Sequence, residues 1–167
     1  MVDPVDVPPT TLVRTLFDHL NEGDLDAMRP HAAEDEFQDL PMVGHIEGRD
    51  AVFEHFEAVL AALPDIHFDL DRVVGEGETV FASWRLTGTF TGAPFYGVRA
   101  TGRRIDIRGI DRFTIRDDKV ASVLAAYDSM DFAIQAGLLP PIDSPAQRAM
   151  VHAINALTAV RRVLRRQ

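Results

Sequence analysis

One acidic residue, Asp111, falls on a predicted strand face that is otherwise apolar. The strand spans about residues 103–115, and its apolar face consists of Ile105, Ile107, Phe113 and Ile115. Burying a lone carboxylate costs several kcal/mol, so this side chain must either pair with a cation or stay protonated with a raised pKa. An arginine partner, or a register slip at a bulge near Gly109, would give Asp111 a structural role. Otherwise the pattern predicts an acid inside a pocket, where it can hold or donate a proton.

A second acidic candidate, Asp39, lies in the segment Phe37-Gln38-Asp39-Leu40-Pro41, after a brief predicted strand over 36–39 and before a rigid turn. Acids in such turns are commonly solvated, so the position alone leaves both a turn role and a catalytic role open. His45 follows in a glycine-flanked loop, either as a surface residue or as one that reaches the mouth of a pocket.

The composition excludes several other chemistries. The chain has no cysteine, which rules out disulfides, thiolate zinc sites and a cysteine nucleophile. Its six histidines show no zinc-site spacing, and no G-x-S-x-G elbow is present. We therefore expect neither a metal nor an organic cofactor. The net charge of −9 argues against a nucleic-acid-binding protein, which needs a basic face.

The elements that must position these residues are predicted by the apolar periodicity. A period of 3.6 residues predicts helices over about 10–22, 25–28 and 48–63. From residue 66 the period changes to 2, which predicts strands as far as Tyr127 and then a short helix over about 129–137. Helices followed by long strands are typical of an α+β fold, here with a curved, mixed but mostly antiparallel sheet wrapped around three N-terminal helices.

The length of 167 residues corresponds to about one domain. We predict a flexible N-terminus over 1–9, the main domain over 10–141 and an amphipathic helix over 142–167. Residues 144–167 hold five arginines and no acid, which suits a packing or dimer helix, an anionic membrane surface or an acidic partner. No apolar run is long enough for an integral membrane span, and the acidic N-terminus is unlike a signal peptide, so we expect a cytoplasmic protein.

Several short segments together resemble the nuclear-transport-factor-2-like superfamily. They are Asn21-Glu22-Gly23-Asp24-Leu25-Asp26-Ala27, Ala33 to Asp39, Ile46 to Val52, Arg112 to Val120, Tyr127-Asp128 and Gln135 to Pro140. The branch they resemble is the SnoaL-like polyketide cyclases, over about residues 10–141. The resemblance implies a cone-shaped barrel, in which three helices and a strongly bent sheet enclose a pocket. It does not imply one reaction, because the superfamily includes isomerases, cyclases, epoxide hydrolases, dehydratases and non-catalytic binders.

The resemblance to ketosteroid isomerases implies roles for the two acids. Their base aspartate matches Asp39, and their buried, protonated aspartate matches Asp111. Their first-helix tyrosine falls at Leu16, so Tyr96 or Tyr127 would have to replace that donor. A solvated carboxylate can accept a proton, while a carboxyl in an apolar row can donate a hydrogen bond to a developing enolate.

Two other patterns of the superfamily do not fit this chain. The aspartate of characterised SnoaL-like aldol cyclases falls at Ala125. The Asp-Arg-Asp set of limonene-epoxide-hydrolase-like enzymes falls near Trp84, Leu86 and Ala125, none of which can do that chemistry.

These observations favour an enzyme that takes a proton from the carbon next to a carbonyl in a hydrophobic, polyketide-like substrate, leading to cyclisation or isomerisation. The expected pocket residues are Leu16, Phe37, Phe56, Trp84, Leu86, Tyr96, Ala125 and Tyr127. One alternative is a non-catalytic ligand-binding or assembly module of the same fold. Another is an epoxide-opening hydrolase or cyclase in which Asp39 and Asp111 flank one substrate oxygen. The resemblance also implies a homodimer formed through the convex face of the sheet.

Overall fold

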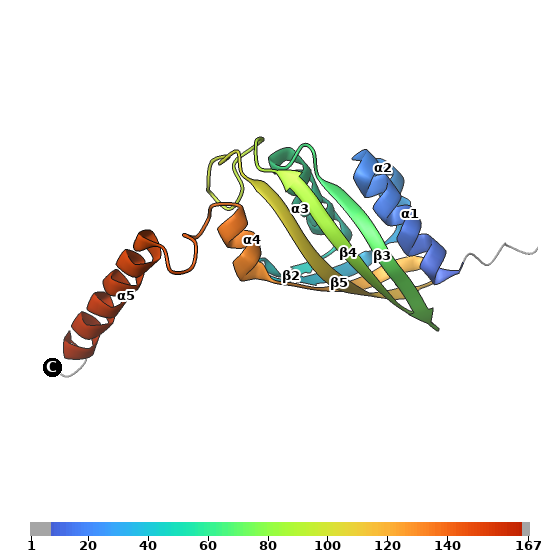
Figure 1. Cartoon of the computed structure of the whole chain (residues 1–167). Coiled ribbons are helices and arrows are strands. Elements are labelled where there is room, and N and C mark those ends of the chain that lie inside the picture. Colours follow the sequence, from blue (N-terminus) through green and yellow to red (C-terminus); the bar gives the residue numbers. More distant parts are fainter. Residues whose placement is uncertain (1–7, 165–167) are drawn as a thin grey trace, which may run out of the picture.

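A computed structural model of the chain describes residues 8–164 (Figure 1). Its helices are α1 (Pro9–Glu22), α2 (Leu25–Met28), the 3₁₀ helix η1 (Arg29–His31), α3 (Arg49–Ala62), α4 (Ser129–Gln135) and α5 (Pro145–Leu164). Its strands are β1 (Ala32–Leu40), β2 (Gly44–Glu47), β3 (His67–Glu76), β4 (Thr79–Thr89), β5 (Arg104–Arg116) and β6 (Lys119–Tyr127). Of the N-terminal segment 1–9, predicted to be flexible, residues 1–7 lie outside the described residues, whereas Pro9 begins α1.

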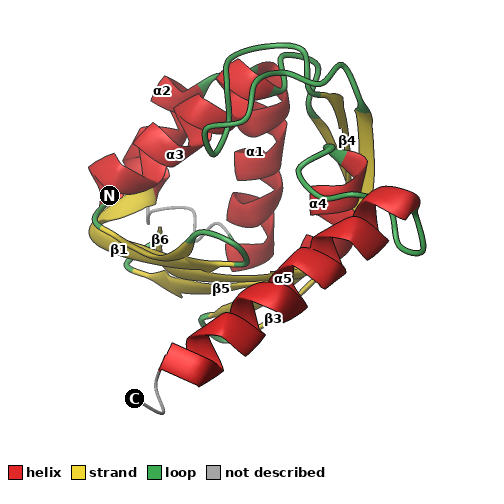
Figure 2. Cartoon of the chain, turned by 90° about the vertical axis from the view of Figure 1, so that its left-hand side faces the viewer, coloured by secondary structure: helices red, strands yellow, loops and turns green. Residues whose placement is uncertain are grey.

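The strands of the described chain form one mixed sheet in the order β2-β1-β6-β5-β4-β3. β1 and β6 pair in parallel, and the other neighbours pair antiparallel. Figure 2 shows the sheet curving around α1, α2 and α3. The predicted cone-shaped α+β fold is confirmed, with a sheet that stays open between the edge strands β2 and β3 over residues 8–164.

The buried side of each element follows the periodicity of the sequence. The buried residues of α1 are Leu12, Val13, Leu16, Phe17 and Leu20. Gly23 ends this helix in a left-handed conformation with φ of 71°, which glycine adopts without the steric cost of a side chain. Along β4 the buried residues are Val80, Ala82, Trp84 and Leu86. Because the helical and strand faces meet, they form one hydrophobic core.

The pairing of β4 with β5 is continuous along the whole of β4, so the register slip considered near Gly109 does not occur. The alternation of inward and outward residues along β5 is therefore unbroken, and the inward residues Ile105, Ile107, Phe113 and Ile115 are buried. Asp111 belongs to this row, between Ala82 on β4 and Ala125 on β6. Gly109 makes room for the Trp84 indole, whose nearest carbon is 2.3 Å from where a Cβ at position 109 would lie.

β1 is longer than the brief strand predicted over 36–39, and its pairing with β6 shifts once along its length. Its last residues alternate between the two faces of the sheet. Glu36 and Gln38 turn inward and are buried, whereas Phe37 and Asp39 turn outward. This alternation decides which residues of β1 reach the concave side.

The C-terminal helix α5 begins at Pro145, and Ser144 Oγ accepts a hydrogen bond from the Gln147 backbone N–H at 3.1 Å. It extends away from the sheet and from the other helices (Figure 1). All the side chains from Arg148 to Ala159 are exposed. A search of residues 8–164 finds no helix that is both long and apolar enough to cross a bilayer.

Removing residues 142–167 is expected to change the melting temperature of the remaining domain by no more than about 2 °C. The reason is that α5 buries little apolar area against the rest of the chain, so its loss removes little hydrophobic stabilisation. Differential scanning calorimetry of the full and shortened chains measures this difference. A fall of more than about 5 °C would show that α5 packs on the domain in solution.

Candidate functional site

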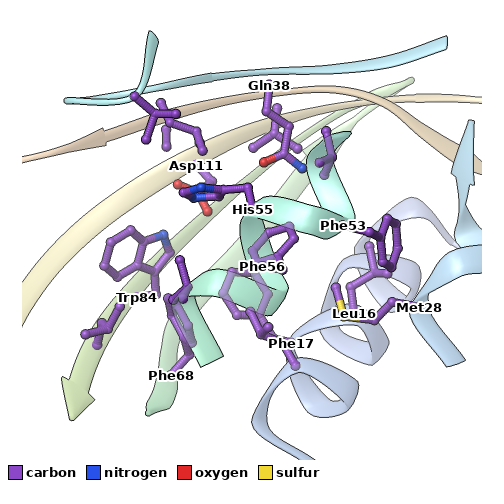
Figure 3. Close-up of a pocket in the computed structure, with 18 of the residues that line it drawn as sticks. Leu16, Phe17, Met28, Gln38, Phe53, His55, Phe56, Phe68, Trp84 and Asp111 are labelled. Carbon is purple, nitrogen blue, oxygen red and sulfur yellow. The ribbon is translucent and has the colours of Figure 1, made fainter. Parts of the chain in front are cut away.

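A cavity of about 160 Å³ lies between the concave face of the sheet and helices α1 and α3. Its lining is mostly apolar, and the polar or titratable side chains in it are His31, Glu36, Gln38, His55, Trp84, Tyr96, Asp111 and Tyr127. Figure 3 shows Asp111, His55 and Trp84 at one end of the cavity. Leu16, Met28 and Phe53 lie toward the other end (Figure 3). A hydrophobic ligand can therefore enter with one polar end facing Asp111.

Asp111 points into this cavity, where its neighbours across the sheet, Ala82 and Ala125, are both small and apolar. Its Oδ1 atom is buried and has no hydrogen-bond partner among the described residues. Among the described residues no arginine forms an ion pair with Asp111, so the predicted alternative of an arginine partner is not found there, and Arg108 and Arg116 on the same strand pair with other acids. Burial raises the pKa of Asp111 from 3.8 to about 7, and the indole N–H of Trp84 opposes part of that rise.

Trp84 supplies an unused hydrogen-bond donor beside this carboxyl. Its Nε1 atom is buried and makes no hydrogen bond of normal geometry in the described part of the chain, although its N–H lies close enough to Asp111 to lower the pKa of that carboxyl. The indole ring is held edge-on against Phe68, with ring centroids 5.5 Å apart, and lies over Gly109. Buried donors and acceptors that lack partners cost free energy until a ligand satisfies them. Trp84 Nε1 and Asp111 Oδ1 therefore mark a place prepared for a polar group of a ligand.

Tyr127 and Tyr96 border the same end of the cavity. The Tyr127 hydroxyl donates a hydrogen bond to the Pro41 carbonyl oxygen at 3.0 Å, which commits its proton to the β1–β2 turn. Burial, with the nearby Tyr96 and Asp111, raises the pKa of Tyr127 to about 12. Burial also raises the pKa of Tyr96, which is about half exposed and has a positive φ of 49°. Because the Tyr127 proton is already donated to Pro41, Tyr96 is the one of the two predicted replacements whose hydroxyl is not committed to that turn.

His55 reaches the cavity from α3. Burial lowers the pKa of His55, which keeps its imidazole neutral at pH 7. Its ring points into the cavity on the same side as Asp111 (Figure 3). A neutral imidazole can both donate and accept a hydrogen bond, so His55 can orient a bound ligand.

The structure brings together most of the predicted pocket. The predicted residues that line the cavity are Leu16, Phe56, Trp84, Leu86, Tyr96, Ala125 and Tyr127. Phe37 is a correction, because it faces out of the sheet and packs against His45 with ring centroids 5.3 Å apart. His45 likewise lies outside the cavity, on the outer side of the β1–β2 hairpin.

Asp39 is not brought to the cavity. Its side chain is 47% exposed, and its Oδ1 atom is 2.8 Å from Nδ1 of His45. The alternation along β1 turns it away from Asp111, so the two predicted acids do not flank one ligand. The geometry expected for a base and an acid in one pocket, or for epoxide opening between the two carboxyls, is therefore not formed by this pair.

Glu36 and Gln38 are cavity residues that the sequence did not point to. Their side chains are only 3% and 4% exposed, and Gln38 Nε2 donates a hydrogen bond to Glu36 Oε1 at 2.8 Å. Burial raises the pKa of Glu36 from 4.5 to about 7, opposed by that hydrogen bond and by the charge of Arg49. The sequence does show that Glu36, Gln38 and Leu40 alternate along the strand and so share one face. Because both faces of this strand carry polar residues, the alternation does not show which face meets the cavity.

The described residues contain no group of three or more histidine, aspartate or glutamate side chains placed to hold a metal ion. The cavity instead offers carboxyl, imidazole, indole and phenol groups on an apolar wall. Such a set can transfer protons and hydrogen-bond to the oxygens of an organic molecule.

Comparisons with known proteins agree with this fold. A similar solved structure is a proposed SnoaL-like polyketide cyclase from Jannaschia sp. CCS1, with TM-score 0.73 and 22% identity over 84% of this chain and 99% of that one. TsrD from Streptomyces laurentii matches with TM-score 0.70 and 24% identity, over 81% of this chain and 100% of its own. IdmH from Streptomyces antibioticus, a proposed polyketide cyclase, matches with TM-score 0.68 and 22% identity, over 78% and 99%.

No curated protein sequence matches the chain. The profile of one protein family, SnoaL-like polyketide cyclase, matches residues 10–136, which include every helix and strand around the cavity. By this match the chain belongs to the SnoaL-like polyketide cyclase family.

Proposed function

We propose that this protein catalyses proton transfer at the carbon next to a carbonyl group in a hydrophobic, polyketide-like substrate, leading to cyclisation or isomerisation. The observation that carries the proposal is the pair of unpartnered polar atoms, Trp84 Nε1 and Asp111 Oδ1, in a mostly apolar cavity. The first can donate to a carbonyl oxygen, while the second can accept a proton from the adjacent carbon.

The reaction begins when the Asp111 carboxylate takes the proton from the carbon. The electrons of the broken C–H bond form the C=C bond of an enolate, and the carbonyl oxygen gains the negative charge. Trp84 Nε1 donates its hydrogen bond to that oxygen, which stabilises the charge in a site of low polarity. In a cyclisation, the enolate carbon then attacks a second carbonyl, and the oxygen of that carbonyl takes the proton from Asp111. In an isomerisation, a different carbon takes this proton and the double bond moves.

One carboxyl can serve in both steps because its pKa is raised to about 7. At neutral pH the protonated and ionised forms are both populated, which is the condition under which general acid–base catalysis is most effective. Asp111 therefore replaces the two-carboxylate arrangement that the sequence suggested.

The position of Asp111 also supports an aldol-type reaction. Resemblance places the aspartate of characterised SnoaL-like aldol cyclases at Ala125, and Asp111 lies directly opposite Ala125 in the β5–β6 pair. Side chains opposite each other on one face of a sheet have Cβ atoms about 5 Å apart. A carboxyl from β5 can therefore serve the part of the cavity that those enzymes serve from the last strand.

The proposal is tested with 2-tetralone, a bicyclic ketone, by following the exchange of its α-protons for deuterium by NMR. We expect the protein to accelerate this exchange over buffer, and Ala125→Phe, which fills the cavity beside Asp111, to reduce the acceleration at least about tenfold. Ala126→Phe is the matched control, because Ala126 is exposed on the outer face of the same strand.

Two outcomes would contradict the proposal. No acceleration by the wild-type protein, with binding of the ketone detected by calorimetry, would make the chain a binding module. Equal losses in the two phenylalanine variants would show that exchange does not take place in this cavity.

A further inference from the structure

The cavity contains a second carboxyl that the proposed reaction does not use. Glu36 and its hydrogen-bond partner Gln38 both line the cavity, and both are almost completely buried. Within the described residues Glu36 forms no ion pair, and the Nε atom of Arg49 nearby is itself buried without a partner. A buried carboxyl costs stability compared with an apolar side chain of similar size, and the Gln38 amide and the nearby charge of Arg49 offset only part of that cost, since the pKa of Glu36 is still raised.

The strand pairing places Glu36 far from Asp111 within the same cavity. β6 lies between β1 and β5, so the backbones of the two acids are two strand spacings apart, or about 10 Å. Gln38 pairs with Val123, whereas Asp111 pairs with Ala125, so Glu36 is also displaced along the strands. The displacement is roughly 13 Å at about 3.3 Å per residue. The two carboxyls therefore belong to separate parts of the cavity wall.

The hydrogen bond within this pair leaves groups for a ligand. Because Nε2 of Gln38 donates to Oε1 of Glu36, the Gln38 Oε1 atom keeps its acceptor capacity. Figure 3 shows Gln38 pointing into the cavity between its two ends. Protonated Glu36 adds an O–H donor, so the pair combines a donor with acceptors, which is the complement of a hydroxyl group.

We propose that Glu36 and Gln38 form a second polar subsite, which binds a hydroxyl group of a hydrophobic ligand whose other oxygen lies at Trp84 and Asp111. The placement of the reacting oxygen rests on the proposed function. The substrate class is thereby narrowed to hydrophobic molecules that carry two separate oxygen groups. A ligand with one oxygen would leave one of the two subsites without its partner.

The experiment uses two probes that differ by one hydroxyl group, 2-naphthol and 2,6-dihydroxynaphthalene, with the dissociation constants measured by calorimetry on the full chain. We expect the wild-type protein to bind the diol about tenfold more tightly than the naphthol, as one added hydrogen bond in a buried site predicts. Glu36→Leu should reduce this ratio to near 1, because it removes the group that binds the second hydroxyl. Glu36→Gln should keep part of the preference, because an amide still donates and accepts.

Two further variants keep the test decisive. Gln38→Leu removes the other member of the pair and should also lower the ratio, even if Glu36→Leu does not fold. Glu34→Leu is the matched control, because Glu34 is exposed on the same strand and should leave the ratio unchanged.

The outcomes separate this subsite from the proposed reaction. An equal affinity of the wild-type protein for both probes, or a preference that survives in both leucine variants of the pair, would overturn the subsite. Loss of the preference for the diol in Glu36→Leu supports the subsite. If the protein also fails to accelerate the exchange of 2-tetralone protons, only the proposed reaction is contradicted.

Discussion

Replacing Asp111 with asparagine is expected to slow the exchange of 2-tetralone α-protons by about 10²- to 10⁴-fold, the range typical of a lost general acid–base group. An amide keeps the size of the carboxyl and can still form hydrogen bonds, but it cannot take a proton from carbon. Initial exchange rates measured by NMR at pH 7 give the size of the loss.

The control is Asp39→Asn, because Asp39 is the other acid that the sequence singles out. Its side chain is exposed and paired with His45 outside the cavity, so this variant should keep the wild-type rate within about twofold. The opposite result, with activity lost in Asp39→Asn and retained in Asp111→Asn, would return the role of base to Asp39.

A transplanted carboxyl provides a stricter test of the same site. In the double variant Asp111→Ala with Ala125→Asp, the carboxyl enters the cavity from β6, opposite its original place. We expect at least tenfold more activity than in Asp111→Ala alone, since the two positions lie about 5 Å apart. Asp111→Ala with Ala126→Asp should show no recovery, because Ala126 is exposed on the outer face.

The same Asp111→Asn substitution is expected to stabilise the fold at high pH. In the unfolded chain the carboxyl has its ordinary pKa of 3.8, whereas burial raises the pKa in the folded protein to about 7. Between these two values the folded state holds a proton that the unfolded state has released, so stability falls as the pH rises. The full difference corresponds to about 4 kcal/mol, because each pH unit contributes about 1.36 kcal/mol. Asparagine carries no charge and avoids this loss.

Urea denaturation followed by circular dichroism at pH 4 and pH 8 measures the effect. The free energy of unfolding of Asp111→Asn should equal that of the wild type at pH 4 and exceed it by a few kcal/mol at pH 8. Glu36 also has a raised pKa, but it is present in both proteins and cancels from the comparison. The same gain at both pH values would mean that Asp111 does not hold its proton in the folded state.

One residue is thus expected to lower stability and to supply activity. Sites that need a shifted pKa in an apolar environment commonly carry this cost, because the group would be more stable in water. A variant that loses the reaction and gains stability at pH 8 would support both statements together.

The sequence by itself determined the α+β fold and the inward position of Asp111. Long strands with a strict period of 2 have only two faces, so Ile105 and Phe113 fix the face of every residue between them as long as no bulge intervenes. The same reasoning puts Trp84 and Leu86 on one face of β4, and this face lines the cavity. The family resemblance followed from short motifs spread over the same elements and is confirmed by the match over residues 10–136.

Only the tertiary structure decided which face of β1 meets the cavity. Both faces of this strand carry polar residues, so its periodicity could not distinguish Glu36 and Gln38 from Asp39. Its orientation is set by parallel pairing with β6, some 80 residues away in the chain, and by the shift in that pairing. A one-residue change of register exchanges the two faces of a strand, and local sequence does not encode a pairing at such distance. For this reason the sequence placed Asp111 on the inward face of β5 but could not identify the polar group that shares its cavity.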